Sequence, residues 1–150
     1  MVQVREEASD AVAYHVGVGI SIATALRGAR IRLARGECTI PRDLIPKGFP
    51  YDKLGGEDPQ SELSEEERRQ LRDAVQGMAM MASAHLVKAR DLQIDVPRHA
   101  RPCFLPVVPA LHFLSKLEKS EFDIFDDELL EPDQLRILLL LGRTWLGGVF

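Results

Sequence analysis

Four closely spaced arginines are the strongest candidate for a functional group of side chains in this sequence. They are Arg27, Arg30, Arg32 and Arg35. Residues 27–53 carry three acidic side chains against seven basic ones, namely these four, Arg42, Lys47 and Lys53. Guanidinium groups bind carboxylates and phosphates through paired hydrogen bonds, so the cluster could contact an acidic protein segment or lipid headgroups. The helix dipole also stabilises cations at the end of a helix, and this second interpretation needs no ligand.

A second charged group consists of Asp123, Asp126 and Asp127, within an acidic stretch over residues 118–133. Closely spaced carboxylates supply the oxygen ligands that Mg²⁺ prefers, so the group could hold a metal-bound diphosphate. The sequence has no second cluster of this kind to share the metal. We therefore interpret the stretch as an acidic linker and assign it no metal.

Nucleophilic catalysis has little support in the sequence. Cys38 lies in an arginine-rich segment, but no histidine is near it along the chain. His15 and His85 fall on apolar faces of predicted helices, where a histidine is more often part of the core than a ligand or a base. We assign no catalytic residue, no metal site and no cofactor.

Composition limits the remaining function classes. The 150 residues are 45% apolar and 28% charged, which suits one globular domain. A net charge of −4 argues against general binding to nucleic-acid phosphates, so we expect no nucleic-acid partner. Two cysteines are too few for a disulfide scaffold or a cysteine-rich zinc site. The longest run without charge, residues 11–26, is shorter than the about 20 residues of a membrane span, so we expect a buried helix there.

The predicted elements are helices joined by loops. Residues 4–26 form the first helix, in which small residues recur every fourth position and share one face. Such a stripe would let another backbone approach closely, and its members are Ala13, Gly17, Ser21 and Ala25. Residues 35–63 contain eight glycines and prolines and are predicted to be a loop.

Three further helices follow that loop. Ser64 and Glu67 have the spacing of a capping box and start a helix that extends to about residue 92. A third helix is predicted over residues 97–117, bent or interrupted by Pro106 and Pro109. The last helix is opened by Pro132 and ends near residues 147–148. The small-residue stripe and residues 137–141 are expected to leave apolar surface uncovered. The fold class is all-α.

Residues 17–41 resemble the second conserved helix and loop of the squalene/phytoene synthase family. The matching residues are Gly17, Leu26-Arg27, Arg35-Gly36 and, with isoleucine in place of leucine, Ile40-Pro41. Residues 85–90 and Leu105-Pro106 resemble the next two helices of the family. The resemblance implies an all-α bundle of the isoprenoid-synthase type. It also implies that residues 1–150 are the C-terminal part of such a domain.

The departures from the family pattern bear on function. In the synthases, two aspartates four residues apart on this helix bind magnesium, and their positions here are Gly28 and Arg32. A guanidinium has the wrong charge to bind Mg²⁺, so this half of the metal site cannot form. The family's other aspartate-rich motif lies on an upstream helix that residues 1–150 do not include. The resemblance thus favours a pseudo-enzyme, and the alternative is an isoprenoid transferase with an altered site.

Within the family, the chain bears a closer likeness to a non-catalytic branch, whose members assist the assembly of respiratory complex I. The matching residues are His15-Val16-Gly17, Thr24 with Leu26-Arg27, residues 84–86 with Ala89-Arg90, and residues 122–125. This likeness implies an assembly factor on the matrix side of the inner mitochondrial membrane, with an import signal outside this chain.

The likeness also implies partners for the arginines. They would be a complex I subunit or assembly intermediate, with the inner-membrane surface as a second candidate. Arg27, Arg30, Arg32 and Arg35 are then expected to contact the partner at the mouth of the former active site.

Overall fold

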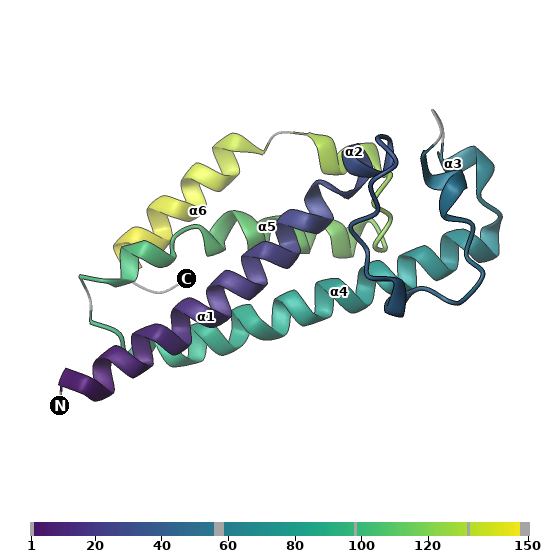
Figure 1. The fold of residues 1–150 in the computed structure, drawn as a ribbon. Coiled ribbons are helices and arrows are strands. Elements are labelled where there is room, and N and C mark those ends of the chain that lie inside the picture. The colour runs from purple at the N-terminus through teal and green to yellow at the C-terminus, as the bar shows by residue number, and fades with distance from the viewer. Residues whose placement is uncertain (1, 56–58, 98, 132, 148–150) are drawn as a thin grey trace.

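The computed structural model describes residues 2–55, 59–97, 99–131 and 133–147, and the elements in these ranges are all helical. The long helices are α1 (Val2–Arg27), α4 (Glu65–Leu92), α5 (Val107–Lys119) and α6 (Gln134–Gly147). The short helices α2 (Ala29–Leu33) and α3 (Pro59–Glu62) lie at one end of the molecule (Figure 1). Short 3-10 segments occupy Arg42–Leu44, Tyr51–Gly55, Gln93–Asp95, Arg101–Phe104 and Asp127–Leu130. The predicted all-α class is confirmed.

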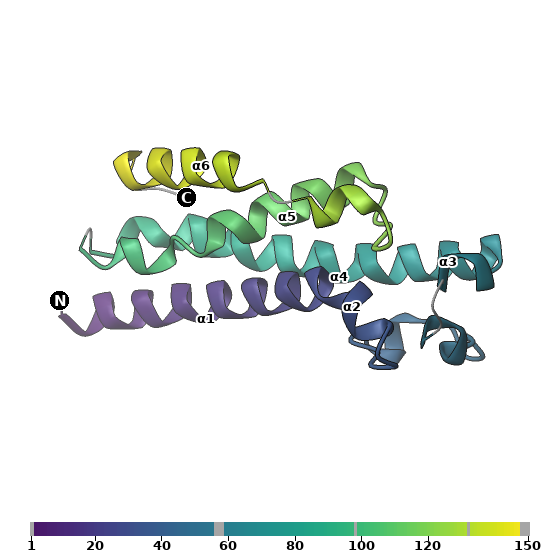
Figure 2. The ribbon, with the colours of Figure 1, turned by 90° about the horizontal axis from the view of Figure 1, so that it is seen from above.

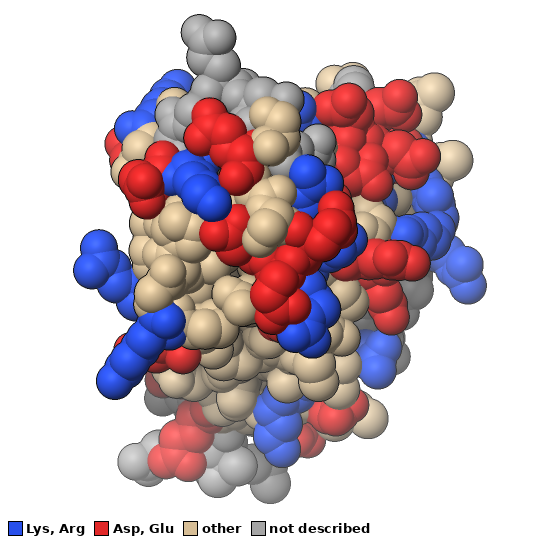
Figure 3. Space-filling view, turned by 90° about the vertical axis from the view of Figure 1, so that its right-hand side faces the viewer, with Lys and Arg blue, Asp and Glu red and all other residues tan. Residues whose placement is uncertain are grey.

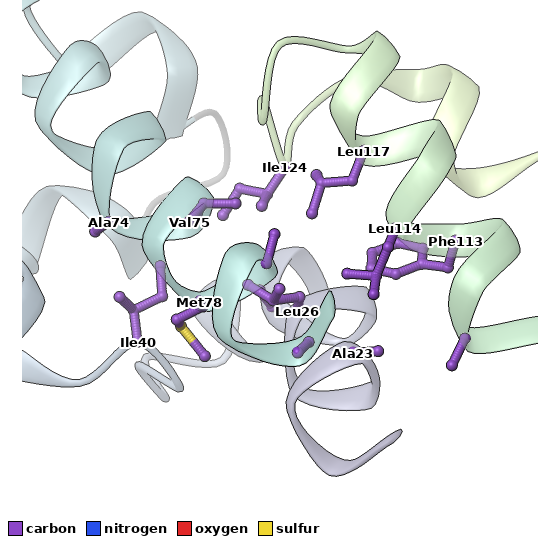
Figure 4. Close-up of a cluster of buried hydrophobic side chains, with 14 of the residues drawn as sticks. Ala23, Leu26, Ile40, Ala74, Val75, Met78, Phe113, Leu114, Leu117 and Ile124 are labelled. Atoms are coloured by element: carbon purple, nitrogen blue, oxygen red, sulfur yellow. The ribbon is translucent and has the colours of Figure 1, made fainter. Parts of the chain in front are cut away.

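The arrangement is a layered bundle. Helices α1 and α4 pack along much of their length, α5 lies against both, and α6 lies on the outer side of α5 (Figures 1 and 2). Between α1, α4 and α5, apolar side chains form one buried cluster (Figure 4). Its labelled members include Ala23, Leu26, Val75, Met78, Phe113 and Leu117. No helix among the described residues has the length and apolarity needed to cross a bilayer.

The start of α4 has the capping box that the sequence predicts. The Ser64 hydroxyl accepts a hydrogen bond from the Glu67 amide at 3.3 Å, and the Glu67 carboxylate accepts one from the Ser64 amide at 2.7 Å. Lys53 donates to the same carboxylate at 2.9 Å, which ties the segment before α3 to the first turn of α4. The Ser64 amide and the Lys53 ammonium both stabilise the charged form of Glu67 and lower its pKa to about 2.

One predicted helix start is wrong, and one predicted loop contains helical turns. The third long helix begins at Val107 rather than at residue 97, and a 3-10 turn over Arg101–Phe104 comes before it. Pro106 is the N-cap of α5 and Pro109 lies in its first turn, where a missing N–H leaves no helical bond unmade. The segment 35–63 also contains short helical turns instead of being loop throughout.

The last helix begins at Gln134, next to the predicted start, and extends to Gly147. Pro132 and residue 148, which were predicted to bound it, lie outside the described residues.

The small-residue stripe of α1 does not make the close contact expected of it. Ala13, Gly17 and Ser21 are exposed, and a Cβ atom on Gly17 would have no neighbour within 4 Å. The close approach is at Gly19, which is buried against α4. A Cβ there would lie 2.5 Å from Leu86 Cδ2 and 3.1 Å from the Ala82 carbonyl oxygen. The bulky buried residues of α1, such as Val12 and Val16, select this face for packing.

Two alanine substitutions in α1 test which face of the helix packs against α4. Gly17→Ala is expected to raise the free energy of unfolding by about 0.5–1 kcal/mol, because alanine is the better helix former and the new methyl group meets open space. Gly19→Ala is expected to lower it by about 1–3 kcal/mol, because the methyl group overlaps Leu86. Chemical denaturation of both variants checks the pair. Equal effects at the two sites would contradict the assigned packing face.

Candidate functional site

The four arginines lie along one nearly continuous helical path. Gly28 separates α1 from α2, yet its amide donates to the Thr24 carbonyl at 3.1 Å and its carbonyl accepts from the Arg32 amide at 3.0 Å. Helical hydrogen bonding therefore passes through the junction. With 3.6 residues per turn, Arg27, Arg32 and Arg35 fall within an arc of about 140°, and Arg30 lies outside it.

The path ends in a Schellman motif. The Glu37 amide donates to the Arg32 carbonyl at 2.9 Å, and the Gly36 amide donates to the Leu33 carbonyl at 2.8 Å. Gly36 has a φ of +77°, which a glycine adopts without the steric cost that a side chain adds. Arg35-Gly36 thus fixes where the helix stops and where the chain turns away.

Arg30 is bound within the protein. Its guanidinium donates to the Phe125 carbonyl at 3.0 Å and to the Asp127 carboxylate at 2.7 Å. These bonds join α2 to the turn that follows α5, where Glu121 and Phe122 both have positive φ. The sequence shows opposite charges in the two segments, but no local pattern pairs residues that are almost a hundred positions apart.

Two other cations of the basic segment also have partners. The Arg42 guanidinium lies 5.5 Å from the centre of the Tyr51 ring, and Lys53 binds Glu67. In contrast, Arg27, Arg32 and Arg35 are exposed, and no ion pair involves them among the residues that the structure describes. The expected four-arginine cluster is therefore a set of three available arginines and one structural arginine.

Arg27 lies at a pocket between α1 and α5. Besides Arg27 and Thr24, the pocket is lined by apolar residues, which include Ile20, Pro106, Pro109 and Phe113. An exposed guanidinium beside apolar walls suits an anionic group attached to an apolar one.

Nearby acidic side chains weaken the positive electrostatic field of the arginines. Near this end of the bundle, Lys and Arg alternate with Asp and Glu over the surface in Figure 3. The described acids near the start of α4 bind their own partners: Glu65 pairs with Arg68 and Glu66 with Arg69. The arginines thus offer local contacts to an anion and not a broad positive field.

The positions that bind magnesium in the synthases do not fit a metal here. Gly28 has no side chain, and Arg32 Nε lies 3.6 Å from where a Cβ of Gly28 would be. The Arg32 guanidinium thus lies in van der Waals contact with the position that the first side-chain carbon would take. Among the described residues, no group of three or more His, Cys, Asp or Glu side chains is placed to bind a metal ion.

The acidic residues after α5 have structural roles. Asp123 Oδ1 accepts a hydrogen bond from the Phe125 amide, Asp126 Oδ1 accepts one from the Glu128 amide, and Asp127 binds Arg30. Each carboxylate is directed to a different partner. The interpretation as a linker is refined by this result, because the segment is an ordered turn with Ile124 and Phe125 buried.

The two histidines that the sequence assigns to the core are half-buried and contact each other. His15 Nδ1 and His85 Nδ1 are 2.9 Å apart, so one ring donates to the other across the α1–α4 contact. Tyr14 packs edge-on against both rings. Cys38 is exposed, and its thiol lies 3.6 Å from the Ile40 carbonyl oxygen.

Comparison with known proteins places the chain among synthase-like proteins. The profile of the family described as Squalene/phytoene synthase matches residues 1–139. A mouse protein named NADH dehydrogenase (ubiquinone) complex I, assembly factor 6, is 29% identical over 143 residues, which is 95% of this chain and 40% of the relative. The human protein of that name is 30% identical over 137 residues, covering 91% and 39% of the two chains.

A more distant organism gives a similar result. A Dictyostelium discoideum homolog of the same assembly factor is 35% identical over 115 residues, covering 76% of this chain and 30% of the relative. The chain thus spans less than half the length of these relatives. No solved structure matches the chain significantly.

The two arginines of α2 are expected to differ in their effect on stability. Arg30→Gln should lower the free energy of unfolding by about 1–2 kcal/mol, because it weakens a charged hydrogen bond to a backbone carbonyl and removes an ion pair. Arg32→Gln, with its exposed side chain, should change it by less than about 0.5 kcal/mol. Denaturant titration of both variants measures the difference. A loss at Arg32 equal to that at Arg30 would show that the cluster acts as one structural unit.

Proposed function

The chain belongs to the squalene/phytoene synthase family, and we propose that it acts in the assembly of respiratory complex I and not in prenyl transfer. The observation that carries the proposal is the pair Gly28 and Arg32, at the positions where the synthases place magnesium-binding aspartates. The Arg32 guanidinium lies over Gly28 and repels a divalent cation. The names of the similar proteins from mouse, human and Dictyostelium support the assembly role.

The proposed location follows from that role. Complex I is assembled at the inner mitochondrial membrane, and the protein would act on its matrix side. Residues 1–150 would form the C-terminal part of a synthase-like domain. We propose that the bundle serves as a scaffold that presents a binding surface to a complex I subunit or assembly intermediate.

The proposed contact surface consists of Arg27, Arg32 and Arg35. All three are exposed, and none is used in an ion pair among the described residues. Arg30 is left out because Asp127 and Phe125 bind it. Each exposed arginine can form paired hydrogen bonds with a carboxylate, so an acidic loop of the partner suits this surface.

Charge reversal tests the arginine surface. Arg32→Glu with Arg35→Glu is expected to weaken docking by roughly tenfold or more, because like charges then face each other across the contact. In cells depleted of the endogenous protein, the full-length variant should restore little complex I, as measured on native gels. Arg30 is unchanged, so the bond to Asp127 that stabilises the fold remains.

The matched control reverses two exposed cations of α4, Lys88→Glu with Arg90→Glu, and should restore assembly as the wild type does. If the Arg32 and Arg35 variant is folded and assembly proceeds unchanged, the arginine surface is only the end of a helix.

The absence of prenyl transfer is tested separately. Full-length protein incubated with farnesyl diphosphate and Mg²⁺ is expected to release no pyrophosphate above background, because positions 28 and 32 supply no carboxylate. A pyrophosphate-coupled assay measures the release. Turnover that a chelator abolishes would establish the transferase alternative.

A further inference from the structure

Helix α6 presents an apolar strip to the outside of the molecule, and we propose that this strip lies in the interface of a lipid bilayer that contains anionic lipids. Large apolar side chains are exposed along the whole helix, from Leu135, which is 80% exposed, to Leu146, which is 88% exposed. Leu138, Leu139 and Trp145 are exposed between them. This surface is separate from the arginine surface and does not depend on the assembly role.

The exposed residues fall on one side of the helix. With 3.6 residues per turn, Leu135, Leu138, Leu139, Trp145 and Leu146 share an arc of about 120°. The opposite side carries Ile137, Leu140, Leu141 and Thr144, all partly buried. Helix α6 is thus apolar on two opposite sides, and the residues that the structure describes cover only one of them.

The attachment of α6 fixes which side faces outward. Helix α6 packs on α5, and the views in Figures 1 and 2 show it as the outermost helix of the bundle. Just before its first residue, Asp133 Oδ2 binds His112 Nε2 at 2.9 Å and lies 3.6 Å from Lys116 Nζ, both on α5. The hydrogen bond from His112 lowers the pKa of Asp133, so this link persists in mildly acidic solution.

The charges of α6 indicate what kind of surface covers the apolar strip. Residues 134–147 contain Arg136 and Arg143 and no acidic residue, although the whole chain has a net charge of −4. Seven positions apart, both arginines lie on the same border of the apolar arc, and Trp145 lies on the other border. An interfacial helix has this pattern, with leucines among the acyl chains, cations at the phosphates and the indole at the headgroup level.

The same pattern sets the orientation of the helix. Arg143 is well inside α6, so a helix crossing the bilayer would carry this charge into the hydrocarbon. A helix parallel to the surface keeps both arginines at the level of the headgroups. The proposed contact is therefore a helix in the plane of the interface, with the bundle held above it.

Trp145 makes the proposal directly measurable, because it is the one tryptophan of the sequence. Addition of phosphatidylcholine vesicles containing phosphatidylglycerol to the full chain should shift its emission to shorter wavelength and make the protein sediment with the vesicles. Vesicles of phosphatidylcholine alone should bind more weakly. Brominated acyl chains should quench the emission if the indole reaches the interface.

Two variants test the two parts of the strip. Leu138→Ser with Leu139→Ser should weaken partitioning by roughly tenfold or more, because two exposed leucines no longer enter the acyl region. Arg136→Gln with Arg143→Gln should weaken binding to the anionic vesicles by about fivefold for each arginine removed. The control, Val87→Ser with Ile94→Ser, changes two exposed apolar residues elsewhere and should bind as the wild type does.

Three results would overturn the proposal. The first is no binding of the folded chain to either kind of vesicle. The second is vesicle binding by the Leu138→Ser, Leu139→Ser variant that equals wild-type binding. The third is a wild-type dimer that binds no vesicle and that these two substitutions dissociate, because a second copy would then cover the strip. None of these measurements uses complex I, so failure here is distinguishable from failure of the assembly role.

Discussion

The packing of α1 on α4 is the contact on which the rest of the structure depends. It is possible because Gly19 has no side chain and Leu86 occupies the space where one would be. The two helices then enclose the apolar cluster that α5 completes, as Figure 4 shows. About one turn before Gly19 on α1, His15 meets His85 across the same contact. With this pair fixed, the end of α1 and the start of α2 have a defined place beside the turn after α5.

That placement decides which arginines are available to other molecules. The helical path through Gly28 directs Arg30 toward Phe125 and Asp127, and the Schellman motif at Gly36 ends the path shortly afterwards. A cluster that looks uniform in the sequence is thereby divided. Arg30 binds within the protein, whereas Arg27, Arg32 and Arg35 are exposed and have no ion pair among the residues that the structure describes.

Features with local causes could be predicted from the sequence. The capping box at Ser64 and Glu67 depends on residues three positions apart, and the structure contains both of its hydrogen bonds. The packing face of α1 could not be predicted in this way, because the stripe through Gly17 and the row through Val12, Val16 and Gly19 both have helical spacing. Which of the two rows is the packing face depends on how α4 lies against α1. The start of α5 was also ambiguous, since prolines are tolerated in the first turn as well as before it. The Arg30–Asp127 bond joins distant segments and has no local signal.

The backbone of the helix around positions 28 and 32 does not depend on which side chains these positions carry. The helix around Gly28 is held by backbone bonds to Thr24 and Arg32, which do not depend on the side chains at either position. A metal site, in contrast, depends entirely on those side chains and on their charge. The helices can therefore form with or without carboxylates at these two positions, and the guanidinium of Arg32 attracts anions where a carboxylate would attract cations. Because the packing of the bundle does not depend on these side chains, the same scaffold can carry the arginines and the apolar side of α6 on its outer surface.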